Sequence, residues 1–178
     1  MNRIIISQNS LVLLCGPAGC GKSTFAAKHF LPTQVVSSDD CRALVSDDAA
    51  NQKVSGHAFD LMHFIIEKRL LLLRLTVADA THLRREDRKS MLKIARWYRY
   101  EAAVIAFNTS IETCLARNRA RERVVPEDAL LTQYDMFQKT LGTIRDERFD
   151  RIYVIDEIEQ DSAAVEIIAP AQRPRPGS

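Results

Sequence analysis

A phosphate-binding pattern near the N-terminus gives the strongest chemical signal in the chain. Residues 16–24 read GPAGCGKST, which fits the P-loop pattern G-x-x-x-x-G-K-[ST]. Glycines allow such a loop to turn several backbone N–H groups toward a phosphate. Lys22 would place a positive charge on the β- and γ-phosphates of a nucleotide, and Ser23 would offer its hydroxyl to Mg²⁺. The pattern predicts a nucleotide-binding protein.

The flanking residues support this prediction. Residues 11–14 form a short apolar run typical of a buried parallel strand, and residues 24–30 can continue as a helix that Pro32 ends. A strand, a glycine loop and a helix in this order place the positive end of the helix beside phosphate. The nucleotide contacts are expected from Gly16, Pro17, Ala18, Gly19, Cys20, Gly21, Lys22, Ser23 and Thr24.

An acidic and a basic residue follow the next predicted strand, residues 34–38. Asp39 would lie at the carboxyl end of the sheet, where ligands bind in such folds, and could accept the proton of an attacking hydroxyl. Arg42 would share a helical face with Asp39, and its planar fork would suit a phosphate on the acceptor. The alternative is an aspartate that caps a helix and an arginine in solvent.

Four arginines alternate with other residues at the end of a predicted helix, residues 110–121. Such density just before Pro126 suggests a mobile lid whose arginines hold a transferring phosphoryl group, although charge runs are often only solvated surface. The P-loop about a hundred residues upstream favours the lid. The four are Arg117, Arg119, Arg121 and Arg123.

Asp79 ends another predicted strand, residues 75–80, and resembles the carboxylate that holds Mg²⁺ in P-loop enzymes. Asp39 competes with it for the metal, directly or through water, and the sequence does not apportion the ion between them. Ser23 is the third candidate ligand. ATP and Mg²⁺, with Mn²⁺ as a substitute, are the expected cofactors.

A basic stretch, residues 84–98, is predicted to be an amphipathic helix with aromatic residues near its end. It could track a nucleic-acid backbone and stack a base. A solvated helix whose aromatic residues lie in the core is the favoured interpretation. The charged residues are Arg84, Arg85, Arg88, Lys89, Lys93, Arg96 and Arg99, and the aromatic ones are Trp97, Tyr98 and Tyr100.

Alternating strands and helices predict an α/β fold with a mostly parallel sheet and helices on both faces. Residues 4–6 read as an edge strand or a lead-in, and residues 40–55 as a loop with a turn of helix. Further helices are expected at 56–74 and 126–141, strands at 101–107 and 151–155, and a short closing element at 164–168.

The bulk properties fit one globular domain, residues 1–169, with residues 170–178 as a disordered tail or linker. The 178 residues carry a formal charge of +2, so a nucleic-acid partner would need locally clustered charge. The four cysteines show no zinc-like pairing, which favours a reduced, cytoplasmic protein. No apolar run is long enough for a secretory signal or a membrane span.

Taken together, GPAGCGKST, then SSDDCR at 37–42, then DAT at 79–81 and the arginine-rich stretch resemble the 5′-hydroxyl polynucleotide kinases. The chain is most similar to the kinase domain of bacterial polynucleotide kinase-phosphatases of RNA repair, over most of residues 10–156. The family often has asparagine where this chain has His82.

The resemblance implies a P-loop phosphotransferase fold close to adenylate kinase, and a role for each matching residue. Lys22 and Ser23 would bind ATP and Mg²⁺, Thr24 would contact the α-phosphate, and Asp39 would be the general base. Arg42 would bind the 3′-phosphate of the acceptor. Arg117 would be the catalytic lid arginine with Arg123 as a second, and Arg121 is a competing match.

The expected function is therefore transfer of the γ-phosphate of ATP to the 5′-OH end of RNA or DNA, in nucleic-acid repair. The partner would be a nucleic acid end, with no membrane, and the chain could be one domain of a larger end-repair protein. A small-molecule kinase of the same fold, acting on a sugar or antibiotic hydroxyl, is the alternative. A P-loop switch or binding module comes third.

Overall fold

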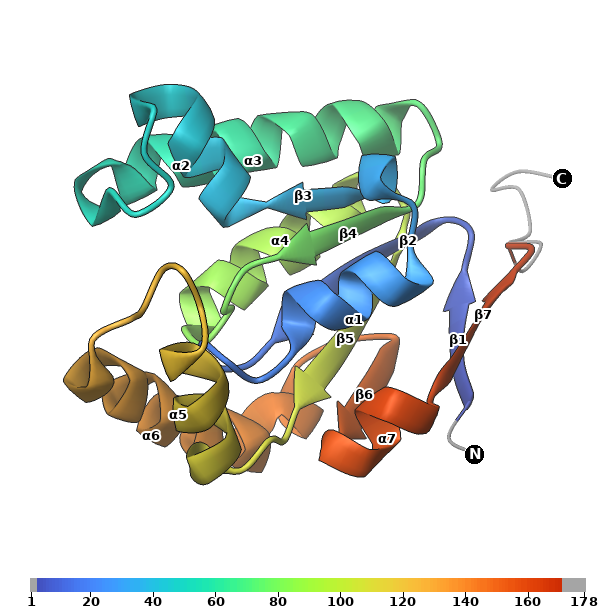
Figure 1. The fold of residues 1–178 in the computed structure, drawn as a ribbon. Helices are drawn as coiled ribbons and strands as arrows, with labels where there is room; N and C mark the ends of the chain where they lie inside the picture. The colour runs from blue at the N-terminus through green and yellow to red at the C-terminus, as the bar shows by residue number, and fades with distance from the viewer. Residues whose placement is uncertain (1–2, 171–178) are drawn as a thin grey trace, which may run out of the picture.

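The computed structural model describes residues 3–170, and its main feature is a parallel sheet covered by helices on both faces (Figure 1). The five strands lie in the order β3-β4-β2-β5-β6, and every pairing is parallel. The predicted α/β fold, with a mostly parallel sheet and helices on both faces, is confirmed. The strands are β2 (Ser10–Cys15), β3 (Val35–Ser37), β4 (Thr76–Asp79), β5 (Glu101–Phe107) and β6 (Arg151–Ile155).

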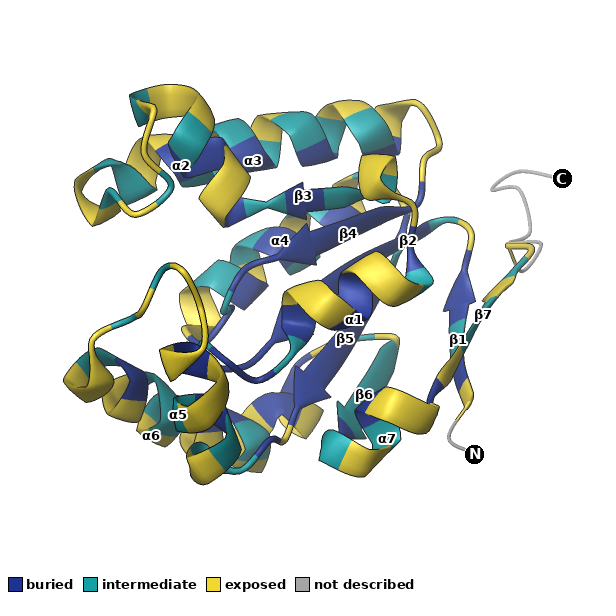
Figure 2. Cartoon of the chain, viewed as in Figure 1, coloured by how far each residue is buried: buried dark blue, intermediate teal, exposed yellow. Residues whose placement is uncertain are grey.

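Side-chain alternation along β2 explains why both faces of the sheet are covered. Leu11 and Leu13 belong to one apolar cluster, whereas Val12 and Leu14 belong to the other. All six residues of the strand are buried, as the dark central strands in Figure 2 show. A strand buried on both faces reads as a continuous apolar run, which is how the sequence revealed it.

Helices divide between the two faces. The buried apolar residues of α3 and α4 join the first cluster, those of α1 and α5 join the second, and α6 contributes to both. The α-helices are α1 (Lys22–His29), α2 (Ser38–Ser46), α3 (Ser55–Leu71), α4 (Arg85–Trp97), α5 (Ile111–Arg119), α6 (Glu127–Thr143) and α7 (Glu157–Ser162). Short 3₁₀ turns are η1 (Pro32–Gln34), η2 (Gln52–Val54) and η3 (Ile144–Asp146).

The first and last strands form a separate two-stranded ribbon. β1 (Arg3–Ser7) pairs in parallel with β7 (Ala164–Ile168) beside the main sheet (Figure 1). The hydroxyl of Tyr153 on β6 donates to the carbonyl of Ile5 at 2.9 Å and accepts from its N–H at 3.1 Å. A side chain thus links the ribbon to the sheet where backbone pairing stops.

Three sequence expectations need correction. Residues 40–55 contain most of α2 and the turn η2 rather than a loop with one turn of helix. Helix α7 was not anticipated. Trp97, which was expected in the core, is 82% exposed. The predicted tail, 170–178, lies almost wholly outside the described residues.

Over the part of the chain that is described, we find no helix of the length and apolarity that crossing a membrane requires.

Candidate active site

The P-loop connects β2 to α1 along a path that only glycine permits at two positions. Gly19 and Gly21 have φ angles of +78° and +104°. A Cβ atom on Gly19 would lie 2.4 Å from the carbonyl oxygen of Cys114, and one on Gly21 would lie 2.4 Å from Oε1 of Gln160. With these φ angles the loop can turn its backbone N–H groups toward a phosphate, as a phosphate-binding loop requires.

Lys22, the first residue of α1, folds back over this loop. Its ammonium donates hydrogen bonds to the carbonyls of Gly16, at 2.9 Å, and Pro17, at 2.7 Å. The residue is 8% exposed, yet it lines the larger of two cavities beside the P-loop. A buried cation held at the start of a helix gives this cavity a strong preference for anions.

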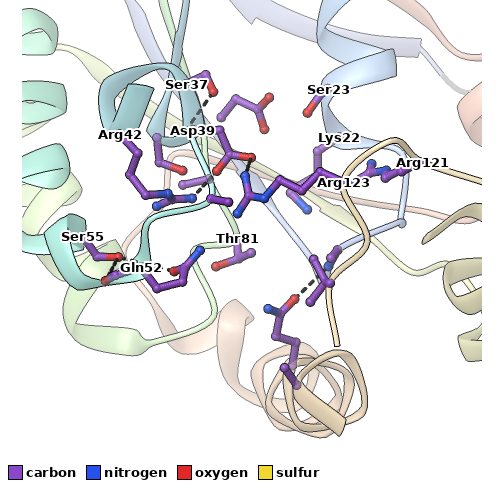
Figure 3. A pocket seen from close by; sticks show the side chains of 18 of the residues that line it. Lys22, Ser23, Ser37, Asp39, Arg42, Gln52, Ser55, Thr81, Arg121 and Arg123 are labelled. Atoms are coloured by element: carbon purple, nitrogen blue, oxygen red, sulfur yellow. Dashed lines mark hydrogen bonds and ion pairs between the residues drawn. The ribbon is translucent and has the colours of Figure 1, made fainter. Parts of the chain in front are cut away.

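The larger cavity has a volume of about 800 Å³ and lies between α2, the P-loop and the segment that joins α5 to α6 (Figure 3). That size suits a nucleotide together with part of an acceptor. Most predicted chemical residues meet here. Its lining includes Ala18, Lys22, Ser23, Asp39, Arg42, Asp79, Arg121 and Arg123.

Ser23 and Asp79 form the pair best suited to a metal ion. Burial raises the pKa of Asp79, while the charge of Lys22 and a hydrogen bond from Ser23 act in the opposite direction. A hydroxyl beside a carboxylate, next to a phosphate loop, fits Mg²⁺, which takes few protein ligands and shares phosphate oxygens. Asp39, the competing carboxylate, is instead bound by two arginines.

Helix α2 places Asp39 and Arg42 on one face. Ser37 caps the helix, because its hydroxyl accepts from the N–H groups of Asp39 and Asp40 at 3.2 and 3.3 Å. Arg42 forms an ion pair with Asp39 and donates from Nε to the carbonyl of Ala49 at 3.0 Å. Arg42 is only 7% exposed. The alternative of a capping aspartate and a solvated arginine is therefore wrong.

The predicted lid reaches across the cavity to the same carboxylate. Residues 120–126 join α5 to α6, and from them Arg123 Nη1 lies 3.1 Å from Oδ2 of Asp39 (Figure 3). Arg42 binds the other oxygen, Oδ1. Arg119 turns away and pairs with exposed Glu127 at 3.2 Å. Of the arginine-rich stretch, Arg123 and Arg121 thus face the larger cavity.

Arg117 lies in a second cavity, of about 360 Å³, on the α1 side of the P-loop. Its Nη1 is 3.5 Å from Oε1 of Gln160, whose amide donates to Thr109 at 2.8 Å. The cavity is separate from the one that holds Asp39, although Arg121 lines both. It also includes Gly19, Gly21, Thr24 and Lys28.

Two residues of the site were missed by the sequence analysis. Gln133 on α6 accepts a hydrogen bond from the N–H of Ala18 at 2.9 Å, and so ties α6 to the P-loop. Gln52, at the start of η2, lines the cavity opposite the lid. No motif marks either residue. Only the fold, which brings segments over a hundred residues apart together, reveals them.

Comparison with known proteins agrees with this geometry. The model of a family described as AAA domain matches residues 11–140. None of the curated proteins compared matches the chain.

Several solved structures share the fold. One chain of the Pnkp1/Rnl/Hen1 RNA repair complex is 20% identical, with a TM-score of 0.66, over 77% of this chain and 46% of that one. The protein thus spans about half the length of that relative. A gluconokinase from Sinorhizobium meliloti is 16% identical, with a TM-score of 0.53, over 84% and 83% of the two chains. A shikimate kinase from Bacteroides thetaiotaomicron is 13% identical, with a TM-score of 0.52, over 86% and 93%. At these identities the likeness concerns the fold.

Proposed function

The chain belongs to the AAA domain family, and we propose that it is an ATP-dependent 5′-hydroxyl polynucleotide kinase. It would transfer the γ-phosphate of ATP to the 5′-OH end of RNA or DNA, in the repair of nucleic-acid ends. The observation that carries the proposal is the Asp39–Arg42 pair on α2, inside the P-loop cavity. A base beside a buried guanidinium suits an acceptor whose hydroxyl lies close to a phosphate.

Asp39 is the proposed general base. Its carboxylate lies in the cavity that Lys22 and Ser23 line, within reach of a hydroxyl placed for attack on a bound γ-phosphate. The proton of the 5′-OH would pass to Asp39 as the 5′-oxygen bonds to the γ-phosphorus and ADP leaves. Positioning and charge neutralisation would supply most of the acceleration, because this chemistry needs little covalent help.

Arg42 is the proposed phosphate contact on the acceptor. Its Nε is bonded to the carbonyl of Ala49 and its Nη2 to Asp39, so the plane of the guanidinium has a defined direction. A planar fork held in this way matches the geometry of a phosphate, which follows every nucleoside in a polynucleotide. Gluconate and shikimate carry no phosphate, and this difference favours a polynucleotide over a small-molecule acceptor.

Lys22, Arg117, Arg121 and Arg123 are proposed to bind the phosphates of ATP. In the present arrangement Arg123 is bonded to Asp39. Movement of Arg123 onto a γ-phosphate would expose Oδ2 of Asp39 to the hydroxyl, so that nucleotide binding prepares the base. Arg117, in the second cavity, is better placed for the α1 side of the nucleotide. Ser23 and Asp79 would hold Mg²⁺, which neutralises phosphate charge when bound.

Label transfer tests the proposal. ATP labelled at the γ-position, with Mg²⁺, should label 5′-OH oligonucleotides of RNA or DNA and leave the same strands with a 5′-phosphate unlabelled. Asp39→Ala should abolish transfer and keep ATP binding. Label on sugars alone would identify the small-molecule alternative, and full activity of Asp39→Ala would refute the role of Asp39.

A further inference from the structure

The sequence leaves one charged feature without a role in the site, and it concentrates on α4. Residues 84–99 contain seven of the 25 Lys and Arg of the chain and two of its 23 acidic residues. This segment therefore carries a charge of +5, whereas the whole chain carries +2, so the residues outside the segment are negative in total. Positive charge clustered in this way is what binding to nucleic acid requires.

Two of these seven cations form ion pairs within the described residues. Arg88 is buried and bonded to Glu147 at 2.9 and 2.5 Å. Arg96 pairs with Asp150 at 2.7 Å. Within residues 3–170 the remaining five are exposed and have no ion pair; they are Arg84, Arg85, Lys89, Lys93 and Arg99.

Spacing places three of the free cations in one row that ends at an aromatic side chain. Arg85, Lys89, Lys93 and Trp97 follow each other at intervals of four residues, so they form a ridge along α4. Like charges at this interval destabilise a helix, and an indole that is 82% exposed gains little from burial. The ridge is therefore expected to destabilise the fold slightly, and its residues are better explained by binding than by stability.

The position of α4 connects this ridge to the site. Its chain enters from β4, whose last residue is Asp79, and Thr81 lines the larger cavity just before the helix (Figures 1 and 3). The helix then runs away from the cavity for about 20 Å. A strand whose 5′ end lies beside Asp39 could leave the cavity over the start of α4.

We propose that the ridge Arg85–Lys89–Lys93–Trp97 binds the single-stranded polynucleotide downstream of the 5′ end that the enzyme phosphorylates. The cations contact successive phosphates, and Trp97 stacks on an unpaired base, as aromatic side chains do in single-strand binding proteins. This inference rests on the proposed polynucleotide kinase function and adds a second contact region outside the cavity. A small-molecule kinase would have no use for it.

Binding can be measured without catalysis, because Trp97 is the only tryptophan of the chain. Titration with a single-stranded oligonucleotide of roughly 16 nucleotides should quench its fluorescence, and added salt should reverse the quenching. The double variant Lys89→Gln, Lys93→Gln should lower the slope of log affinity against log salt by about 1.4, since each single-strand phosphate contact contributes about 0.7. Gln preserves the helix propensity of Lys.

The matched control removes the same charge from the neighbouring helices, as Lys68→Gln on α3 with Lys139→Gln on α6. Both control residues are exposed, and the control should bind like the unmodified protein. No quenching, or equal salt slopes in the two double variants, would overturn the proposal.

Kinetics separate this inference from the function on which it rests. With the long acceptor, Trp97→Ala should raise KM roughly five- to a hundredfold, the loss expected for one stacked base, and leave kcat unchanged. With a 5′-OH dinucleotide, Trp97→Ala should have the same KM as the unmodified protein. With the long acceptor, Trp97→Phe should restore most of the loss that Trp97→Ala causes. If Trp97→Ala and the unmodified protein have equal KM values for acceptors of every length, the ridge is refuted while the kinase stands. Salt-dependent binding without transfer would keep the ridge and refute the kinase.

Discussion

His82 occupies the position where the polynucleotide kinases that the sequence resembles often have asparagine. Its φ is +45°, a conformation that asparagine and histidine adopt more readily than most residues. Nδ1 lies 2.8 Å from the carbonyl of Leu14, while the His82 carbonyl accepts from Arg88 at 2.7 Å. The family asparagine would fit the same backbone. The position therefore supports the end of β2, where the P-loop begins.

The buried imidazole predicts a pH dependence of stability. Burial lowers the pKa of His82 to about 4, and the nearby charges of Lys22, Arg88 and His63 act in the same direction. Between pH 6.5, its ordinary pKa, and about 4, the unfolded chain binds a proton that the folded protein does not. The free energy of unfolding should fall by about 3 kcal/mol as pH decreases through this window.

Urea unfolding of His82→Asn tests this assignment. Asparagine tolerates the positive φ but does not titrate, so the variant should lose this part of the pH dependence and keep most of its stability near pH 7. The difference between the two proteins isolates His82 from Asp79 and Asp87, whose pKa values are also shifted. Parallel stability curves for variant and parent would contradict it.

Arg42 carries the second prediction at this scale. Arg42→Ala should raise KM roughly ten- to a hundredfold for an acceptor with a 3′-phosphate, because a hydrogen bond to a charged group is lost. A bare nucleoside should be affected far less. Arg42→Lys keeps the charge but not the fork, and should recover only part of the loss. Equal losses on both acceptors would disprove the phosphate contact.

Elements with a regular apolar pattern were predictable, and those fixed by long-range contacts were not. The strand, loop and helix around Lys22 and the helix capped by Ser110 agree with the sequence analysis. Helix α2 was hidden because two of the three residues that it buries, Ser38 and Arg42, are polar, and the Ser37 cap is its main signal. The pairing of β1 with β7 depends on residues about 160 positions apart.

The lid illustrates the same limit at the site. The density of arginines indicated a lid, but nothing in the sequence said that Arg123 binds Asp39, 84 residues away, or that Arg117 lies in another cavity. Composition locates such a segment, whereas the partner of each arginine depends on how α5 and α6 pack on the sheet.

Removal of Arg123 should therefore separate chemistry from stability. Arg123→Ala is expected to lower kcat about a hundredfold or more, as loss of a charge-stabilising donor does. The free energy of unfolding should change by less than about 1 kcal/mol, because its pair with Asp39 is partly exposed. Arg119→Ala, in the same segment but paired with Glu127, is the matched control and should keep its kcat. Equal kcat values for the two variants would exclude Arg123 from the reaction.

At the scale of the whole molecule, the fold alone does not select the acceptor, because an RNA repair protein, a gluconokinase and a shikimate kinase share it. The charge distribution supports the proposed acceptor. Arg42, the proposed phosphate contact, lies inside the cavity, and the proposed binding ridge of exposed cations on α4 begins just outside it. Both features suit an acceptor with a phosphate at each step.

A direct competition between acceptors tests this account most simply. The protein is given labelled ATP and Mg²⁺ with a 5′-OH oligonucleotide, gluconate and shikimate in one mixture, with Asp39→Asn alongside. We predict that the 5′-OH ends take up the label with a kcat/KM at least about a thousandfold above either small molecule, and that the variant transfers none. Label on gluconate or shikimate, with the oligonucleotide left unphosphorylated, would contradict the proposed function.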